Sequence, residues 1–391
     1  MPSPGNAPDT LSDYEADLKR IEADLAELGG AAFAVPVKSG ETTLYVYRLF
    51  ARGSLNGNLK ELRAVEAAID RAIECVGPAE DLCLLKANLD FKLHRLAETR
   101  RDLAMAPALA GRRQGQVLLA DLAFQEGRYQ EARRALEALA ADDLTWDVLA
   151  RIAHIEGKLG NAEKADQLYV QAEDEITAKE MRSFAWVELQ RGLLDLGRGR
   201  VDEALAHYNC AERAYSGYWL TEEQMGDALA SAVHYERVLK KVNKPEVAEK
   251  LGKLYAADGK STRAEQLFER ALSDYLESAE RGEVHYYHHL TEFFADVRRN
   301  GEEAVRWAQK DIELRDNFNT QAALAWALHC AGRSAEGIAY MERALLSGVK
   351  DAALYKRATL IFEGAGERAK AHHWGHRAAR LNPLGIQAHV H

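Results

Sequence analysis

The residues of this 391-residue sequence with the clearest capacity for chemistry are histidines, which gather in the segment His285-Tyr-Tyr-His288-His289. On a helix, positions three and four apart share a face, so these three imidazoles would point to one side. Neutral imidazoles on one face can share a zinc or copper ion, and His389 and His391 would add nitrogens if the end of the chain folded back. The alternative is that the histidines bond to nearby carbonyls or face water while the two tyrosines pack between helices.

A weaker histidine cluster and the cysteines complete the candidates for chemistry. The cluster is His372, His373 and His376, and the cysteines are Cys75, Cys83, Cys210 and Cys330. The sequence has no HExxH, no GxSxG and no GxxxxGK[ST] motif. The cysteines sit in helical patterns where they act as small apolar residues. We therefore expect no enzyme activity, although a cysteine acting with a distant histidine is an alternative that spacing does not address.

Composition limits the partners. The formal net charge is −10 with 29% charged residues, which suits a basic or mixed-charge protein partner and argues against nucleic acid. Sparse cysteines without CxxC spacing favour a reducing compartment. No apolar run is long enough for membrane insertion, and the first residues lack an apolar signal core, so we expect a cytoplasmic protein. A periplasmic protein whose signal peptide has been removed would look the same.

The beginning of the chain predicts a flexible arm and one amphipathic helix. Residues 1–10 carry three prolines and no periodicity. Residues 11–43 are expected to hold the helix and a linker. Its apolar stripe recurs at spacings of three and four: Leu11, Tyr14, Leu18, Ile21, Leu25 and Leu28. One interpretation is that the stripe covers the first repeat, and the other is that it forms a coiled-coil homodimer.

From residue 44 onward the sequence repeats a helix, a short turn and a helix. The clearest unit runs from Leu251 to Leu272. Gly252 and Ala264 are small where two antiparallel helices must approach closely. Gly259 supplies the left-handed backbone that ends the first helix.

This unit resembles the tetratricopeptide repeat (TPR) family, of the bacterial type, whose motif spans about 34 positions. The residues at the close-packing position of the second helix recur along the chain: Ala132, Ala165, Ala204, Ala264, Ala304, Gly337 and Ala371. The long interval between Ala204 and Ala264 predicts an inserted helix near residues 221–241. We expect eight to nine helix pairs over residues 44–384, followed by a tail at residues 385–391.

The resemblance implies an all-α, right-handed α-solenoid whose first helices line a concave groove. Members of the family hold peptides or helices of partner proteins there, which implies a protein-interaction scaffold or adaptor. The alternatives are a metal-binding or small-ligand-binding carrier that uses the histidine clusters, and a non-catalytic subunit of an enzyme complex. On the repeat register, the candidate partner-binding residues are Asp121, Phe124, His154, Lys253, Tyr286, His289, Phe293, Trp326 and His329.

Overall fold

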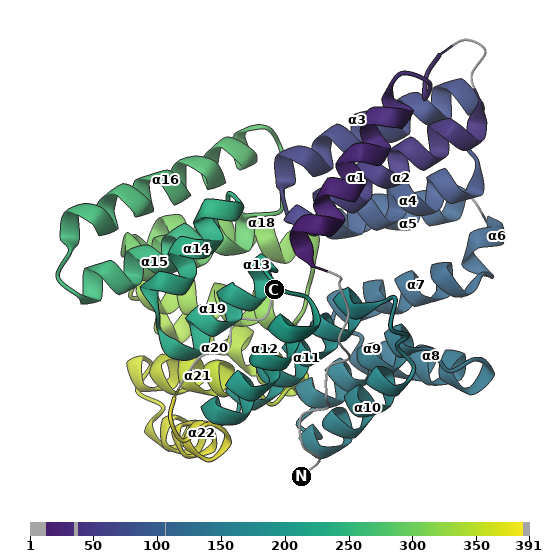
Figure 1. The fold of residues 1–391 in the computed structure, drawn as a ribbon. Helices are drawn as coiled ribbons and strands as arrows, with labels where there is room; N and C mark the ends of the chain where they lie inside the picture. Colours follow the sequence, from purple (N-terminus) through teal and green to yellow (C-terminus); the bar gives the residue numbers. More distant parts are fainter. Residues whose placement is uncertain (1–12, 35–37, 106, 386–391) are drawn as a thin grey trace.

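The computed structural model describes residues 13–34, 38–105 and 107–385, and these residues form an all-α solenoid (Figure 1). The first half of the solenoid is built from α1 (Tyr14–Gly29), α2 (Ser39–Asn56), α3 (Leu59–Val76), α4 (Glu80–Lys92), α5 (Leu96–Met105), α6 (Pro107–Ala110), α7 (Arg113–Gln125), α8 (Tyr129–Asp142), α9 (Trp146–Lys158), α10 (Ala162–Asp174), α11 (Met181–Leu196) and α12 (Val201–Ala214). We call these helices the first winding.

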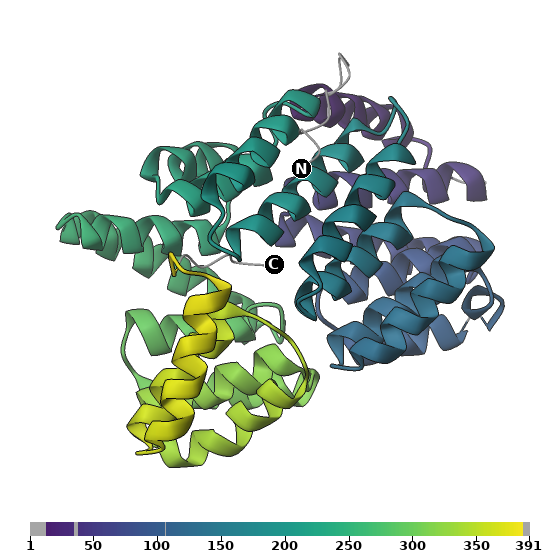
Figure 2. The same cartoon turned by 90° about the horizontal axis from the view of Figure 1, so that it is seen from below.

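The second winding consists of α13 (Trp219–Leu229), α14 (Ala232–Lys241), α15 (Pro245–Ala257), α16 (Ser261–Glu280), α17 (Tyr287–Glu292), the π-helical turn η1 (Phe293–Val297), α18 (Gly301–Leu314), α19 (Phe318–Cys330), α20 (Ser334–Leu346), α21 (Ala352–Gly364) and α22 (Arg368–Leu381). Seen from below in Figure 2, α18 to α22 lie on one side of the molecule and α1 to α10 on the other. None of the helices in the described ranges is long and apolar enough to cross a membrane.

Within the described residues, successive helices pack as pairs: α2–α3, α4–α5, α7–α8, α9–α10, α11–α12, α13–α14, α15–α16, α17/η1–α18, α19–α20 and α21–α22. There are more pairs than the sequence predicted, because residues 219–241 form the pair α13–α14 and not one inserted helix. The turn of that pair has Ala230 in the left-handed conformation, at φ 46°, whereas most of the other turns use glycine; His94 and Arg299 are the two other exceptions among the described residues. The missing turn glycine, together with helices of only 11 and 10 residues, explains why the pair was not recognised.

Glycines allow the two helices of a pair to cross closely. A Cβ atom at Gly252 would lie 2.6 Å from the ring of Phe268, and one at Gly226 would lie 2.5 Å from the ring of Tyr235. Ala264 is only 2% exposed on the opposing helix. Each crossing therefore places an aromatic ring over a backbone without a side chain, which confirms the packing role predicted for Gly252 and Ala264.

The two windings touch each other along their length. Hydrogen bonds join Trp219 to the carbonyl of Leu55 at 2.8 Å and Tyr215 to Asp17 at 2.9 Å. Arg63 of α3 forms an ion pair of 2.6 Å with Glu283. The partners in such contacts lie 164 to 221 residues apart in the chain. One full winding of the superhelix therefore returns the chain to a position directly against the preceding winding.

Three consecutive turns of the first winding dock on three consecutive loops of the second. The carbonyl of Gln125 accepts a hydrogen bond of 2.8 Å from the side chain of Asn317. The carbonyl of Lys158 accepts one of 2.8 Å from the amide of Lys350. The carbonyl of Leu196 accepts a longer one, 3.4 Å, from the side chain of Asn382. Successive repeats of the first winding therefore lie opposite successive repeats of the second winding.

The amphipathic helix at the start of the chain packs inside the molecule. Tyr14, Ile21 and Leu25 of α1 are buried against α2 and the second winding. This packing uses the stripe that had suggested a coiled-coil homodimer. Helix α2 begins at Ser39, within the segment expected to be a linker. The predicted arm at residues 1–10, and the predicted tail apart from Gly385, lie outside the described residues.

Candidate functional site

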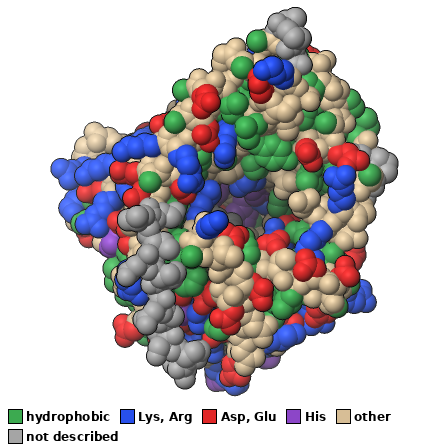
Figure 3. Space-filling model, turned by 45° about the vertical axis from the view of Figure 1, so that its right-hand side comes forward, with side chains coloured by type: hydrophobic (Ala, Val, Ile, Leu, Met, Phe, Trp, Pro, Cys, Tyr) green, Lys and Arg blue, Asp and Glu red, His purple; other side chains and the backbone are tan. Residues whose placement is uncertain are grey.

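The inner face of the superhelix encloses a hollow. Figure 3 shows it near the centre of one face, with His and with Lys or Arg side chains inside. One of the cations on the first helices is Lys92, the last residue of α4. It is exposed to water, yet burial among surrounding protein is the largest cause that lowers its pKa, to about 8. We call this hollow the central chamber.

Three cations from different repeats act on one another. Arg182 at the start of α11 and Lys244 at the start of α15 both lower the pKa of Lys92, after burial itself. The Lys244 ammonium lies 4.9 Å from the centre of the Trp219 ring and has Glu246 only at 3.7 Å. Neither Lys92 nor Arg182 forms an ion pair with any described residue. The mutual repulsion of these three groups would be relieved by a bound anion.

The predicted histidine cluster does not form a metal site. One of its members, His288, belongs instead to a series of charged and hydrogen-bonded groups. Arg315 lies 2.6 Å from Nδ1 of His94 and 3.2 Å from Asp311. Asp311 also contacts Nδ1 of His288 at 3.1 Å, and Arg315 is the largest charged influence that lowers the pKa of this buried carboxyl. This series connects the α4–α5 loop of the first winding to α17 and α18 of the second.

The other two histidines of the cluster point to different neighbours. The ring of His285 stands edge-on to His94 at 4.8 Å, and the ring of His289 stacks on Tyr275 at 5.7 Å. No group of three or more His, Cys, Asp or Glu residues suited to a metal ion occurs in residues 13–34, 38–105 and 107–385. The metal site expected at His285, His288 and His289 is therefore not formed there, because each imidazole has a separate partner. His389 and His391 lie outside the described residues.

The candidate groove residues of the first winding lie on α7 and α9 and face one another. The Asp121 carboxylate accepts hydrogen bonds of 2.9 and 3.0 Å from Arg151. The ring of Phe124 contacts the ring of His154 at 5.3 Å. Burial, and then the charge of Lys158, lower the pKa of His154 to about 3, so the imidazole is neutral at ordinary pH.

The candidate groove residues of the second winding divide into accessible and inaccessible ones. Tyr286 and Phe293 are 7% and 0% exposed, packed against Tyr275, so their assignment to a partner-binding surface is wrong. Tyr286 is the residue just before α17, and Phe293 is the first residue of the π-helical turn η1. His289 is half-buried on the ring of Tyr275.

Three further groove candidates keep part of their surface free. The Lys253 side chain is 42% exposed and pairs with Glu249 at 2.7 Å. Trp326 donates a hydrogen bond of 2.8 Å to Asp296, and its ring stacks on His329 at 5.1 Å. These contacts leave the side chains ordered and still partly accessible. They lie on α15 and α19, each the first helix of its pair.

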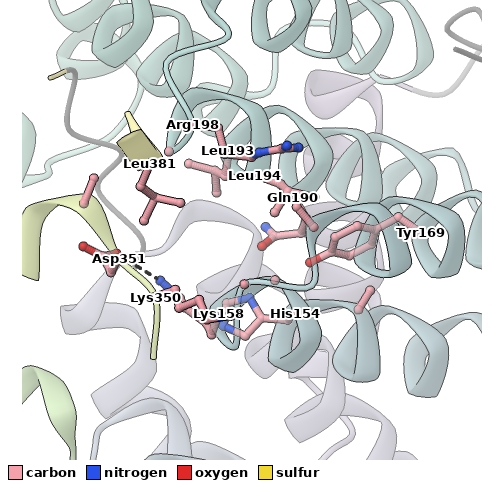
Figure 4. Close-up of a pocket in the computed structure, with 16 residues that line it drawn as sticks. His154, Lys158, Tyr169, Gln190, Leu193, Leu194, Arg198, Lys350, Asp351 and Leu381 are labelled. Carbon is pink, nitrogen blue, oxygen red and sulfur yellow. Dashed lines mark ion pairs between the residues drawn. The ribbon is translucent and has the colours of Figure 1, made fainter. Parts of the chain in front are cut away.

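A separate cavity lies where the two windings meet, and we call it the seam cavity (Figure 4). Its volume is about 200 Å³. Its walls come from α9, α10 and α11 of the first winding, and from the α20–α21 loop and the end of α22 of the second. The polar residues around it are His154, Lys158, Tyr169, Gln190, Arg198, Lys350 and Asp351.

A buried ionic network also lies in the first winding, between α10, α11 and α12. Arg191 is 4% exposed and contacts Asp166 at 2.9 Å and Glu173 at 3.0 Å. Glu188, fully buried, lies 2.6 Å from Nδ1 of His207. The buried Arg191 cation has carboxylates as its partners, which indicates a structural role for the network.

Three of the four cysteines, Cys83, Cys210 and Cys330, do not offer an activated thiol. Burial, and then the neighbouring Glu188, raise the pKa of the Cys210 thiol to about 12. Burial, and then Asp296, raise that of Cys330 to about 11. Burial is also the largest cause that raises the pKa of Cys83. These three thiols are held in the protonated form, in which they are weak nucleophiles.

Comparisons with known proteins place the chain among helical repeat proteins. The family described as TT21 fifth ARM repeats domain matches residues 113–218, which hold the pairs α7–α8, α9–α10 and α11–α12. The comparison with curated proteins found no match.

Several solved structures resemble the chain at low identity. A monomeric mutant of IFIT1 with m7Gppp-AAAA is 13% identical, at a TM-score of 0.37 with 93% of this chain and 95% of that chain covered. The human IFIT1 dimer with PPP-AAAA is also 13% identical, at a TM-score of 0.34 with the same coverage. The APC/C hetero-tetramer Cut9–Hcn1 is 14% identical, at a TM-score of 0.43 with 87% and 74% covered.

Sequence reasoning missed the three cations of the central chamber and most of the seam cavity. Lys92, Arg182 and Lys244 are far apart in the chain, and each stands at an end of a first helix, where the repeat motif carries no signal. Numbering the repeats from their first helices would have placed them on the inner face. The seam cavity depends on the number of repeats in one winding, which spacing along the sequence does not reveal.

Proposed function

We propose that this chain is a non-catalytic interaction protein that binds an extended, acidic segment of a partner protein in its central chamber. The repeats are of the tetratricopeptide type on this proposal, because their period and their small residues at helix crossings follow that motif. Solenoids of stacked helix pairs present long inner surfaces suited to extended ligands. The three thiols held protonated, and the metal ligands kept apart, also favour binding over catalysis.

The single observation that carries this proposal is the cationic group Lys92, Arg182 and Lys244. In a protein of net charge −10, three cations that repel one another, which we assign to the central chamber, favour an anionic occupant. Lys92 and Arg182 form no ion pair with a described residue, and Lys244 has Glu246 at 3.7 Å. The overall charge had suggested a basic or mixed-charge partner. The chamber, in contrast, favours carboxylates.

Mixed contacts elsewhere on the inner face suit a peptide. Lys253 on α15, and Trp326 and His329 on α19, offer a cation, a stacking surface and a hydrogen-bonding group on two first helices of the second winding, with α17 between them. Aromatic side chains in partly enclosed sites contribute strongly to peptide affinity. An acidic segment with apolar residues between its carboxylates would match both the cationic group and the mixed surface of Lys253, Trp326 and His329.

The proposal is tested with three fluorescent peptides of about 12 residues, one rich in glutamate, one rich in lysine and one neutral, long enough to span several repeats. Fluorescence anisotropy measures their binding to the full chain. We expect the glutamate-rich peptide to bind most tightly and its affinity to fall as salt is raised. The variant Lys92→Glu/Arg182→Glu/Lys244→Glu should weaken this binding at least tenfold.

A matched control separates the chamber from net charge. Lys60, Arg134 and Lys240 are exposed and form no ion pair with a described residue. Changing these three to glutamate alters the net charge equally but leaves the chamber intact, and should change the affinity less than twofold. If both triple variants lose the same affinity, or if the wild type does not bind the glutamate-rich peptide, the proposal is wrong.

A further inference from the structure

The seam cavity has a polar floor whose side chains have no hydrogen-bond partner among the described residues. Tyr169 is only 2% exposed, and it lines the cavity together with Gln190 and His154. In Figure 4 the Tyr169 hydroxyl points toward the other two side chains. None of the three side chains hydrogen-bonds to another described residue. Buried polar groups are normally paired, so this floor is suited to a ligand with hydrogen-bonding atoms.

The floor is uncharged, which fixes the bonds it can make. Burial raises the pKa of Tyr169, so its hydroxyl remains protonated and can donate. His154 is neutral and therefore has one donor and one acceptor nitrogen. The Gln190 carboxamide can also act in both ways. A hydroxyl, carbonyl or carboxylate oxygen of a ligand would find partners among these groups.

The rim of the cavity carries more positive than negative charge. Lys158 has the carboxylate of Asp351 as a distant partner, at 3.9 Å. Lys350 and Arg198 form no ion pair with any residue in the described part of the chain. Leu193, Leu194 and Leu381 supply apolar walls between the rim and the floor. The lining thus has the three parts of a small-molecule site: apolar surface, a few convergent hydrogen-bonding groups and a charged anchor.

We propose that the seam cavity binds a small organic anion, with its acidic group held by Lys158, Arg198 and Lys350 and its body against the leucines and the polar floor. This site is separate from the central chamber cations and takes a different class of ligand. It belongs to both windings, since Lys350 and Leu381 come from the second and the floor comes from the first. A bound anion would therefore hold the windings together at the bond between Lys350 and Lys158.

The test uses benzoate and phenyl phosphate as probes, with benzyl alcohol as the uncharged analogue and acetate and inorganic phosphate as anions without an apolar body. Isothermal titration calorimetry on the full chain measures binding, and thermal unfolding measures stabilisation. We expect benzoate, phenyl phosphate or both to bind at least tenfold more tightly than the other three probes. A preference between the two aromatic anions tells whether the acidic group is a carboxylate or a phosphate.

Two variants and one control locate the site. Tyr169→Phe removes the hydroxyl of the floor, and Lys350→Met removes a cation of the rim. Lys350 is exposed on a loop, so its replacement leaves the fold intact. Each variant should weaken the aromatic anion at least fivefold, whereas Lys179→Met, on an exposed lysine away from the cavity, should not.

The outcomes are distinct from those for the peptide. Binding that survives both Tyr169→Phe and Lys350→Met, or no binding of either aromatic anion, overturns the assignment of the seam cavity. The Lys92→Glu/Arg182→Glu/Lys244→Glu variant should keep its affinity for the aromatic anion. Loss of anion binding in that variant alone would move the site to the central chamber and would also overturn the proposal.

Discussion

A Cβ atom on Gly127 would lie 2.9 Å from the carbonyl oxygen of Asp316, although the two residues belong to different windings of the superhelix. Gly127 is also the left-handed turn residue between α7 and α8, at φ 76°. One glycine therefore serves both the turn within a repeat and the contact between windings. The neighbouring turn at Gly199 meets the side chain of Asn382 in the same way, with a distance of 2.6 Å for a Cβ atom.

This double role predicts unequal costs for the same substitution at two turn glycines. Gly332 has the same φ of 76°, but nothing lies within 4 Å of its Cβ position. Gly332→Ala should lower the free energy of unfolding by about 1 kcal/mol, the cost of a left-handed alanine. Gly127→Ala should cost about 2–3 kcal/mol, because the methyl group also forces the windings apart. Urea unfolding measures both values, and equal losses would show that the windings do not touch at Gly127.

The close crossing of α15 and α16 leads to a prediction about Ala264. Replacing this buried alanine with arginine forces a long charged side chain against Gly252, and should lower the free energy of unfolding by about 3 kcal/mol or more. Ala256→Arg is the matched control, because Ala256 is exposed on α15. Its effect should stay within about 0.5 kcal/mol. An unchanged melting curve for Ala264→Arg would show that the repeat register is misplaced.

The buried network around Arg191 should be intolerant of losing its cation. Arg191→Leu leaves the carboxylates of Asp166, Glu173 and Glu188 without their shared partner, and should destabilise the chain by about 3–5 kcal/mol. Arg20 also contacts a carboxylate, Asp17 at 2.7 Å, but its side chain is 70% exposed. Arg20→Leu should cost less than about 1 kcal/mol. Similar losses, measured by chemical denaturation, would contradict a structural role for the network.

The neutral state of His154 predicts a loss of stability in acid. Its pKa is about 3 in the folded chain and 6.5 for the ordinary side chain. As the pH falls from 6.5 toward 3, the unfolded chain therefore takes up a proton that the folded chain does not. His154→Gln lacks this proton uptake. Between about pH 7 and pH 4.5 the wild type should lose about 1–2 kcal/mol more than the variant. Parallel loss in both proteins would show that His154 is protonated when folded.

The sequence predicted the repeating units because their packing is local. Gly252, Ala264 and Gly259 lie within one unit, and the spacing of small and large residues reports directly on how its helices cross. The pair α13–α14 escaped recognition because its turn uses Ala230 and its helices are short. The same crossing rule is nevertheless present in Gly226 and Tyr235.

The site was harder to predict because it depends on contacts between windings. The bond between Arg315 and His94 spans 221 residues, and nothing in either segment indicates the other. The metal hypothesis counted three histidines on one helical face, but α17 begins at Tyr287, so His285 precedes the helix and turns toward His94. The repeat register placed Tyr286 and Phe293 in the groove, but both rings pack against Tyr275 of α16.

The most direct test of the binding proposal is photo-crosslinking with the glutamate-rich peptide, carrying one benzoylphenylalanine at its centre, followed by mass spectrometry of the crosslinked fragments. We expect adducts on the first helices α4, α11 and α15, and the loss of these adducts when excess unlabelled peptide is added. Adducts confined to the second helices α3, α8 and α16, with α4, α11 and α15 unmodified, would contradict the binding proposal.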